Sequence, residues 1–144
     1  MKYNYQNPFD VLVLRYNEIG LKGGNRKRFE KVFIKNIKKL LREIEDLTTL
    51  QDRGRIVLAR KGIVPFTEEQ QEIIAEELHK AFGLSSYSPA FMCKPKWKAI
   101  RSLIGENFPG IYAQHDQGGP VRFRTRARRS YKKFPYTSKE LEIA

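Results

Sequence analysis

The spacing of apolar side chains in the first two thirds of the chain switches between the period of a strand and that of a helix. Residues 10–16 hold a run of consecutive aliphatic side chains, which is typical of a strand buried on both faces. Residues 26–44 then repeat apolar side chains every three or four positions, which predicts a helix with one buried stripe. The predicted stripe consists of Phe29, Val32, Phe33, Ile37, Leu40, Leu41 and Ile44.

A hairpin and a second helix are predicted next. Residues 48–51 and 55–60 are short strand candidates, and the Asp-Arg-Gly turn between them is typical of a hairpin. Thr67 and Gln70 have the spacing of a capping box, so we expect a helix to begin there. The apolar stripe of this helix is expected to comprise Ile73, Ile74, Leu78, Ala81 and Phe82.

The last strand of this region is expected at residues 84–93. Gly83 suits the end of the preceding helix, and Pro89 indicates a sheet edge, a bulge or the end of the strand. The order of elements is therefore strand, helix, strand, strand, helix, strand, which is the ferredoxin-like βαββαβ arrangement. We predict an α+β chain whose residues 1–93 form this domain.

Residues 94–144 predict a second, less complete unit. Pro95 suits the first position of a helix, residues 108–119 resemble a loop, and Thr137 with Glu140 forms another capping box. The apolar residues of the helix after Pro95 are expected to be Trp97, Ile100, Leu103 and Ile104. A lone helix, one strand and a short terminal helix do not make a closed core. We therefore expect an incomplete α/β domain that is cut from a longer protein or completed by a partner.

The segment from residue 121 to residue 128 alternates strictly between two kinds of side chain. In a strand, one face would carry Val121, Phe123, Thr125 and Ala127, and the other would carry Arg122, Arg124, Arg126 and Arg128. Arg129, Lys132 and Lys133 follow, and no acid lies between residues 122 and 133. We call residues 121–133 the arginine segment.

The arginine segment predicts a site for a polyanion. Guanidinium groups on one strand face repel one another unless a partner supplies anions, and phosphate oxygens suit the planar guanidinium fork. A nucleic-acid backbone is such a partner. The alternative is a solvated strand face that is kept charged to protect a sheet edge.

Aromatic residues lie among these cations and directly after them. Tyr131 and Phe134 are candidates for stacking on unpaired bases. Phe134 fits a position in the core equally well, so both interpretations of that residue stay open.

The glycine-rich turn at residues 19–25 is a secondary candidate. Lys22, Asn25 and Arg26 could reach a phosphate of a long ligand, and Asn25 is also expected to cap the following helix. The spacing matches no nucleotide fingerprint, so a purely structural turn is the alternative. The lysine- and arginine-rich face of the helix at 26–44 is interpreted as solvated surface, with a direct RNA role as its alternative.

The charge of the chain is uneven. The formal net charge is +12, and residues 94–144 carry 12 basic and 4 acidic side chains, a net of +8, against +4 for residues 1–93. This asymmetry indicates a nucleic-acid or anionic-membrane partner for the second unit. No apolar run has the length of a membrane span and no signal peptide is evident, so we expect nucleic acid and not a membrane as the partner. The single cysteine fits a reducing cytoplasm, where we expect the protein to be located.

Motifs for catalysis and metal binding are absent from the sequence. It contains no Walker loop, Cys/His cluster, G-x-S-x-G elbow or H-E-x-x-H pair. His79 and His115 are isolated and expected at the surface, and the single cysteine, Cys93, is expected as a small buried hydrophobe. We therefore predict no catalytic residue, no metal ligand and no cofactor in this chain.

Three stretches resemble the tRNA 4-thiouridine synthetase family, the ThiI-type tRNA sulfurtransferases. RYNEIGLKGGNRKRFE, from Arg15, is similar to the opening motif of that family, although Asn17 stands where glycine is usual. FRTRARRSYKKFPYTSKELE, from Phe123, resembles the core of its THUMP domain, with Tyr131 where aspartate is common. GLSSYSPA, from Gly83, is similar to the segment that joins the two.

The resemblance implies a ferredoxin-like domain at 1–93, followed by a C-terminally truncated THUMP domain at 94–144. In the family these modules bind the acceptor stem and 3′ CCA end of tRNA, so that 4-thiouridine can be made at position 8. The adenylating domain, with its SGG-x-DS loop and its ATP and Mg, has no counterpart in this sequence. The family also implies a cysteine-desulfurase sulfur donor, a possible homodimer and a link to thiamine biosynthesis.

Two other functions fit the same residues. The chain could be a stand-alone basic adaptor for an acidic protein, or the RNA-binding part of another THUMP enzyme, such as a methyltransferase or a pseudouridine synthase. The opening motif argues against the second of these. Within that motif, Arg15 is expected either to brace the junction between domains or to touch RNA.

Overall fold

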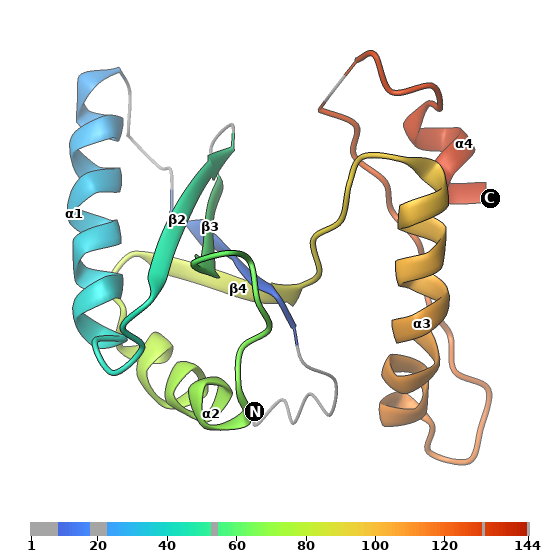
Figure 1. Ribbon diagram of the computed structural model, residues 1–144, viewed down its shortest axis with the longest axis horizontal. Helices are drawn as coiled ribbons and strands as arrows, with labels where there is room; N and C mark the ends of the chain where they lie inside the picture. The colour runs from blue at the N-terminus through green and yellow to red at the C-terminus, as the bar shows by residue number, and fades with distance from the viewer. Residues whose placement is uncertain (1–8, 18–22, 53–54, 131, 144) are drawn as a thin grey trace. The chain divides into compact units, whose positions relative to one another are not determined.

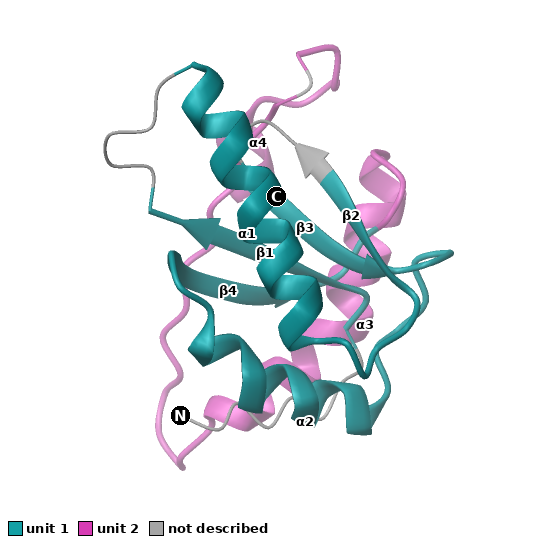
Figure 2. Ribbon diagram, turned by 90° about the vertical axis from the view of Figure 1, so that its left-hand side faces the viewer, with its two compact units in different colours: residues 1–92 teal, residues 93–144 magenta. Residues whose placement is uncertain are grey.

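The computed structural model describes residues 9–17, 23–52, 55–130 and 132–143, which form two compact units (Figures 1 and 2). Unit 1 spans residues 1–92 and unit 2 spans residues 93–144, so the division lies one residue from the expected boundary. The elements of unit 1 are β1 (Val11–Tyr16), α1 (Gly24–Leu40), β2 (Leu47–Asp52), β3 (Arg55–Arg60), α2 (Glu68–Glu77), the short 3₁₀ helix η1 (Leu78–Lys80) and β4 (Leu84–Ala90). Those of unit 2 are α3 (Trp97–His115) and α4 (Ser138–Ile143).

Unit 1 has the predicted ferredoxin-like fold. Its four strands form one antiparallel sheet in the order β2-β3-β1-β4, and α1 and α2 lie over the same face (Figures 1 and 2). The register places Leu14 opposite Ile56 on one side and Tyr87 on the other. β4 is an edge strand, which explains why Pro89 is tolerated within it.

The core of unit 1 is built from alternate residues of β1 and from one stripe of α1. Leu12 and Leu14 are fully buried, and they belong to the same cluster as Phe33, Ile37 and Leu41. The predicted stripe of α1 is confirmed at these positions. Val32 is an exception, because 52% of it is exposed, and it lies at the border of the stripe.

In the apolar stripe predicted for the second helix, one residue is not buried as expected. Ile74 and Leu78 are buried, but Phe82 is 90% exposed. The reason is that the helical structure ends at Lys80, so the helical period no longer applies two residues later. Gly83, with a φ of 86°, then turns the chain into β4.

The two helix starts of unit 1 differ in their capping. Thr67 and Gln70 exchange the two hydrogen bonds of a capping box, with distances of 3.0 and 3.2 Å, as predicted. The prediction that Asn25 caps α1 is wrong. The cap position is Gly23, with a φ of 60°, and Asn25 lies in the first turn. A glycine there accepts a backbone angle that asparagine tolerates less well.

Unit 2 contains a longer helix than the sequence predicted. Residues 108–115 were expected in a loop, but α3 continues through Pro109 to His115. Phe108 and Tyr112 are four residues apart, and their ring centroids lie 6.0 Å apart, so helical side-chain pairing persists beyond the proline. Pro95 lies outside the helix, which begins at Trp97.

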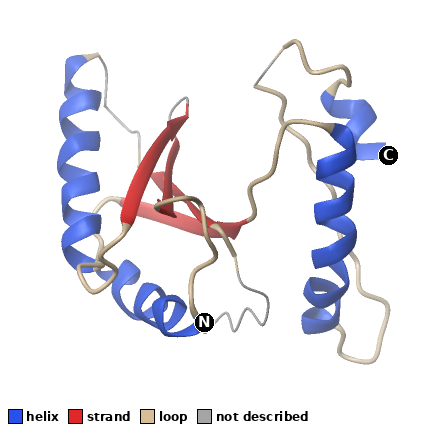
Figure 3. Ribbon diagram, viewed as in Figure 1, coloured by secondary structure: helices blue, strands red, loops and turns tan. Residues whose placement is uncertain are grey.

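The predicted strand at residues 121–128 is not formed. Among the described residues, strands occur only in unit 1, and residues 116–130 and 132–137 run as loop (Figure 3). A strand requires a hydrogen-bonded neighbour, and the described part of unit 2 offers α3 and α4 instead. The expectation that Cys93 is buried is also wrong, because its side chain is exposed.

Candidate nucleic-acid interface

The arginine segment is fixed to α4 through alternate residues. The hydroxyl of Thr125 donates to the carbonyl oxygen of Glu142 at 3.0 Å, and the amide of Ala127 donates to Oε1 of Glu142 at 2.9 Å. The amide of Arg129 donates to the hydroxyl of Ser138 at 3.2 Å. The two-residue period of the sequence therefore survives, although the partner is a helix and not a strand.

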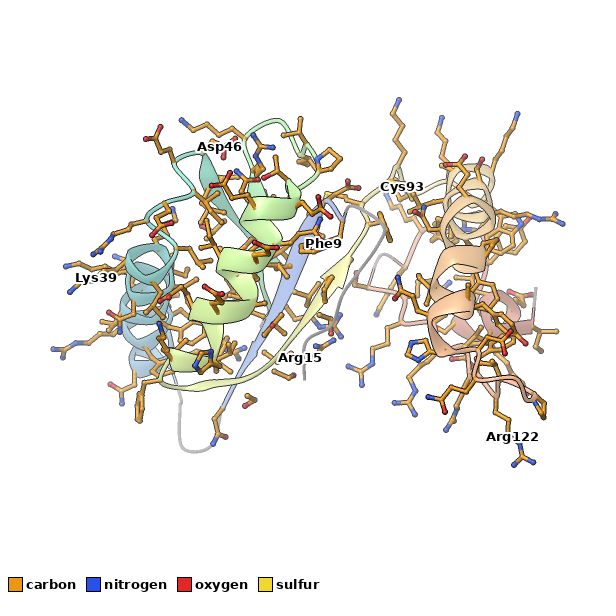
Figure 4. All side chains as sticks on the ribbon, turned by 90° about the horizontal axis from the view of Figure 1, so that it is seen from below. Phe9, Arg15, Lys39, Asp46, Cys93 and Arg122 are labelled. Atoms are coloured by element: carbon orange, nitrogen blue, oxygen red, sulfur yellow. The ribbon has the colours of Figure 1, made fainter. Side chains whose placement is uncertain are left out.

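Two arginines, Arg126 and Arg128, lie between these anchors, and Arg122 and Arg124 precede the first of them. Arg122, Arg124, Arg126 and Arg128 are exposed, and within the described residues none of them makes a hydrogen bond or an ion pair. Figure 4 shows the side chain of Arg122 extending away from the ribbon. Lys132 and Lys133 are also exposed. The segment thus presents guanidinium groups whose donors are available to an external anion.

The anchoring helix is itself held at its start by the second predicted capping box. The amide of Thr137 donates to the carboxylate of Glu140 at 2.6 Å, and the amide of Glu140 donates to the Thr137 hydroxyl at 3.3 Å. The Thr137 amide and hydroxyl, and the nearby Arg129 guanidinium, lower the pKa of Glu140 from its ordinary value of 4.5. Near neutral pH the carboxylate is therefore charged, and it stabilises the start of α4.

Arg129 differs from the other arginines. Its guanidinium donates to the carbonyl oxygens of Phe134 and Tyr136 at 3.4 and 3.5 Å. These contacts close the loop between the arginine segment and α4. The structure therefore gives Arg129 a positioning role, which leaves fewer of its donors for a ligand.

Two phenylalanines near the arginines differ in exposure from what the sequence predicts. Phe134 is only 8% exposed, and its ring lies 6.2 Å from that of Tyr136, so the structure supports the core position and not the stacking role. Phe123 was expected on the apolar strand face, but it is 63% exposed between Arg122 and Arg124. Sequence reasoning missed Phe123 as a stacking candidate. Its arginine neighbours on both sides were the available signal. Tyr131 lies outside the described residues.

Phe123 contacts Phe108 within unit 2. The two rings pack in a T-shaped arrangement, with 5.0 Å between their centroids. Phe123 lines a hollow of about 510 Å³ together with Phe108, Tyr112, His115 and Arg122. Because 63% of Phe123 is exposed, its ring is accessible to a planar ligand such as a base.

Of the secondary candidates in unit 1, Arg26 is engaged in the fold. Nε of Arg26 lies 3.3 Å from Oε1 of Glu30, which in turn accepts the hydroxyl of Tyr16. Burial and the bond to Glu30 raise the pKa of Tyr16 above its ordinary value of 10.0. Asn25 is exposed in the first turn of α1. Lys22 lies outside the described residues.

Arg15 also has a partner within unit 1. Its guanidinium donates to the hydroxyl of Ser88 at 2.8 Å, from β1 to β4 across the sheet. The side chain remains exposed, so this contact braces the sheet without removing the charge from the surface.

The described residues carry charge but no cluster of catalytic or metal-binding groups. Within them, no group of three His, Cys, Asp or Glu residues could hold a metal ion. His79 and His115 are exposed, as expected. No helix in the described ranges is long and apolar enough to cross a membrane. What this arrangement can do chemically is bind anions.

Comparison with known proteins identifies the family. The family model of the ThiI ferredoxin-like domain matches residues 11–88, which is most of unit 1 and more than half of the chain. The chain belongs to the ThiI family. The family that the sequence resembles is thereby confirmed.

Relatives of this ThiI-family chain are named as tRNA sulfurtransferases. A protein of Brevibacillus brevis with the name "Probable tRNA sulfurtransferase" is 30% identical over 92% of this chain. A protein of the same name in Methanocaldococcus jannaschii is 35% identical over 90% of it. The chain spans only 31% and 33% of the length of these two relatives.

Two solved structures have the same fold. PH1313 from Pyrococcus horikoshii Ot3 matches 92% of the chain with a TM-score of 0.73 and 29% identity, and the chain covers 41% of it. A 4-thiouridine synthetase in complex with RNA and with bound ATP matches 94% of the chain with a TM-score of 0.67. The chain covers 31% of that structure. At 24% identity, this second likeness establishes the fold alone.

Proposed function

We propose that this chain is the tRNA-binding part of a tRNA sulfurtransferase that makes 4-thiouridine. The observation that carries the proposal is the row of four exposed arginines, which have no partner among the residues that the structure describes and whose backbone is anchored to α4. Such an arrangement matches the regularly spaced phosphates of an RNA strand. Support comes from relatives named as tRNA sulfurtransferases, and from the like-folded 4-thiouridine synthetase that is complexed with RNA.

The proposed contact on the tRNA is the acceptor arm with its 3′ CCA end. Residues 94–144 would act as the THUMP domain, with the arginines on phosphates and Phe123 on an unpaired base. An exposed ring between two guanidinium groups suits single-stranded nucleotides, because every base offers a face for stacking. A duplex, with its bases already stacked, would use the arginines alone.

The reaction itself belongs, in this proposal, to parts of the relatives that the chain does not span. Adenylation of uridine 8 with ATP and Mg, sulfur transfer from a cysteine desulfurase, and any dimerisation are proposed for the whole protein. The role of this chain would be to hold the tRNA so that position 8 reaches the reacting groups.

The test reverses charge within the arginine segment. The double substitution Arg124→Glu, Arg126→Glu should weaken tRNA binding by at least about tenfold, which equals about 1.4 kcal/mol. The matched control is Lys98→Glu, Arg101→Glu on α3, where both side chains are exposed and the change in net charge is the same. This control should lower affinity much less, because its charges lie outside the arginine segment.

Equal losses in the two double variants would overturn the site, because they would show that only total charge matters. Unchanged affinity of a folded Arg124→Glu, Arg126→Glu variant would overturn it as well. Removing the 3′ CCA from the tRNA tests the proposed contact with the single-stranded end, and affinity should fall if the chain binds those nucleotides. Absence of tRNA binding in the unmodified chain would favour a basic adaptor for an acidic protein.

A further inference from the structure

A second basic surface lies on unit 1, along α1 and the turn that follows it. Its seven cations are exposed, and within the described residues none makes a hydrogen bond or an ion pair. They are Lys27, Arg28, Lys31, Lys35, Lys38, Lys39 and Arg42. We call this the α1 basic face. Figure 4 shows Lys39 on the outer side of α1.

The α1 basic face is unfavourable for the isolated helix. Lys27, Lys31 and Lys35 are four residues apart in succession, and like charges at that spacing repel each other. Lys27 also lies in the first turn, where the helix dipole disfavours cations and no acid is present. The one acid within α1, Glu30, is bonded to Tyr16 and Arg26. An external anion would relieve this repulsion.

An exposed aromatic ring lies at the C-terminal end of the same face. Phe82 is 90% exposed and lines an open hollow of about 430 Å³ together with Lys39, Arg42 and Lys80. Two acids, Glu43 and Glu77, also line this hollow. Glu77 is paired with Lys80 at 2.7 Å, so Lys39 and Arg42 remain without partners among the described residues.

The position of Phe82 is fixed by the turn that follows it. Gly83 has a φ of 86°, and a Cβ there would meet Cζ of Phe29 at 3.0 Å, so the turn packs closely against α1. The carbonyl oxygen of Gly83 also accepts the amide of Asn17 at 3.1 Å. A single exposed apolar side chain is ordinary on a protein surface. What distinguishes Phe82 is that its ring shares a hollow with the cations Lys39 and Arg42.

We propose that the α1 basic face and Phe82 form a second RNA-binding surface, separate from the arginine segment. The cations would contact the phosphates of a strand that runs along α1, and an unpaired base would stack on Phe82. The proposal rests on RNA as the partner of this chain, as stated above, and adds a site on the other unit.

RNA fits this surface better than an acidic protein does. Lysine is depleted from protein–protein interfaces, whereas five of the seven cations here are lysines. Cations with one exposed ring are the usual composition of sites for single-stranded nucleic acid. Because α1 rises 1.5 Å per residue, its cations from Lys27 to Lys39 extend over about 18 Å. That length accommodates several nucleotides.

The test compares Phe82 variants of the whole chain in their binding to a tRNA with an intact 3′ end. Phe82→Ala and Phe82→Leu should each weaken binding by about 5- to 150-fold, because both lose the stacking face. Phe82→Trp should retain the affinity. Val64→Ala is the control, since Val64 is another exposed apolar residue of unit 1, with 40% exposure, and should leave binding unchanged.

The outcomes separate this proposal from the proposed function. If the unmodified chain binds tRNA, and loses affinity when Arg124 and Arg126 are reversed, but Phe82→Ala has no effect, the second surface is wrong and the first stands. If Phe82→Leu keeps full affinity while Phe82→Ala loses it, the site is an apolar docking site, and base stacking is overturned. No binding of tRNA by the unmodified chain would overturn both proposals.

Discussion

The two units of this chain use similar local signals but reach very different degrees of packing. In unit 1, two helices cover a four-stranded sheet, and thirteen buried residues form one hydrophobic cluster. In the described part of unit 2, only Phe134 is buried, and α3 buries no residue. The difference shows that local signals are enough to define helices such as α3, whereas a buried core forms only where several elements cover one another's apolar faces.

Both units contain a Thr capping box, and both boxes are formed. Capping depends on residues within one turn, so it does not require a core. The strand predicted at 121–128 does require a neighbour, and it is not formed. Exposed basic surfaces occur in both units, because exposed cations do not require a buried core.

The largest expected effect is a difference in the free energy of unfolding between alanine variants of one isoleucine in each unit. Ile37→Ala removes a fully buried side chain and should lower the free energy of unfolding by about 2–5 kcal/mol. Ile104→Ala, at a residue that is 54% exposed, should change it by less than about 0.5 kcal/mol.

The measurement is urea unfolding followed by two signals. Far-UV circular dichroism reports on the helices of both units, and fluorescence of the single tryptophan, Trp97, reports on α3 alone. Ile37→Ala should shift the part of the circular dichroism transition that Trp97 fluorescence does not follow, and it should leave the fluorescence transition in place. A common shift of both transitions would show that the two units unfold together, contrary to the comparison.

A smaller effect is expected at the two capping threonines. Thr67→Ala should cost about 1 kcal/mol in the unfolding of unit 1, because α2 loses its cap. Thr137→Ala should leave that transition unchanged, but it should release the anchors on α4. Faster amide hydrogen exchange at Ala127 and Arg129 would report this, since their amides donate to Glu142 and Ser138. Unaltered exchange at these amides would mean that α4 does not hold the arginine segment.

The smallest effects are expected at opposite ends of the pH range. Because the pKa of Glu140 is lowered in the folded chain, its charged carboxylate stabilises the fold fully above pH 4.5. This stabilisation is lost as the pH falls through the folded-state pKa. Because the pKa of Tyr16 is raised in the folded chain, its neutral hydroxyl stabilises the fold fully below pH 10.0. This stabilisation is lost as the pH rises through the folded-state pKa.

Acid should therefore loosen α4 first, and alkali should loosen unit 1 first. Amide resonances of Thr137 and absorbance of tyrosinate would follow the two changes. Glu140→Gln and Tyr16→Phe are the controls, because each variant removes the titrating group. Persistence of either change in its control variant would assign it to another residue.

The sequence was sufficient to predict unit 1 because the period of its apolar residues is satisfied within the unit. Leu12, Leu14, Ile37 and Leu41 are buried as their spacing indicates. Phe82 was placed wrongly because its period was extended past the end of a helix. The end depends on Gly83 and on how closely the turn approaches Phe29, which no local pattern shows.

The candidate site was predicted in part. The alternation of the arginine segment identified Arg122, Arg124, Arg126 and Arg128 as exposed cations, and the structure leaves them without partners among the described residues. The sequence alone could not predict that Phe134 is buried and Phe123 is exposed. Which ring is buried depends on contacts with Phe108 and Tyr136, which come from other segments.

The most direct test of the account is the salt dependence of tRNA binding by the unmodified chain. If the basic surfaces bind about five phosphates, log K should fall against log salt concentration with a slope of roughly −3.5 to −4.5. Arg124→Glu, Arg126→Glu should make that slope less steep by roughly 1.4 to 1.8, which corresponds to two lost phosphate contacts. A flat salt response would contradict the central claim that this chain binds tRNA through its exposed arginines.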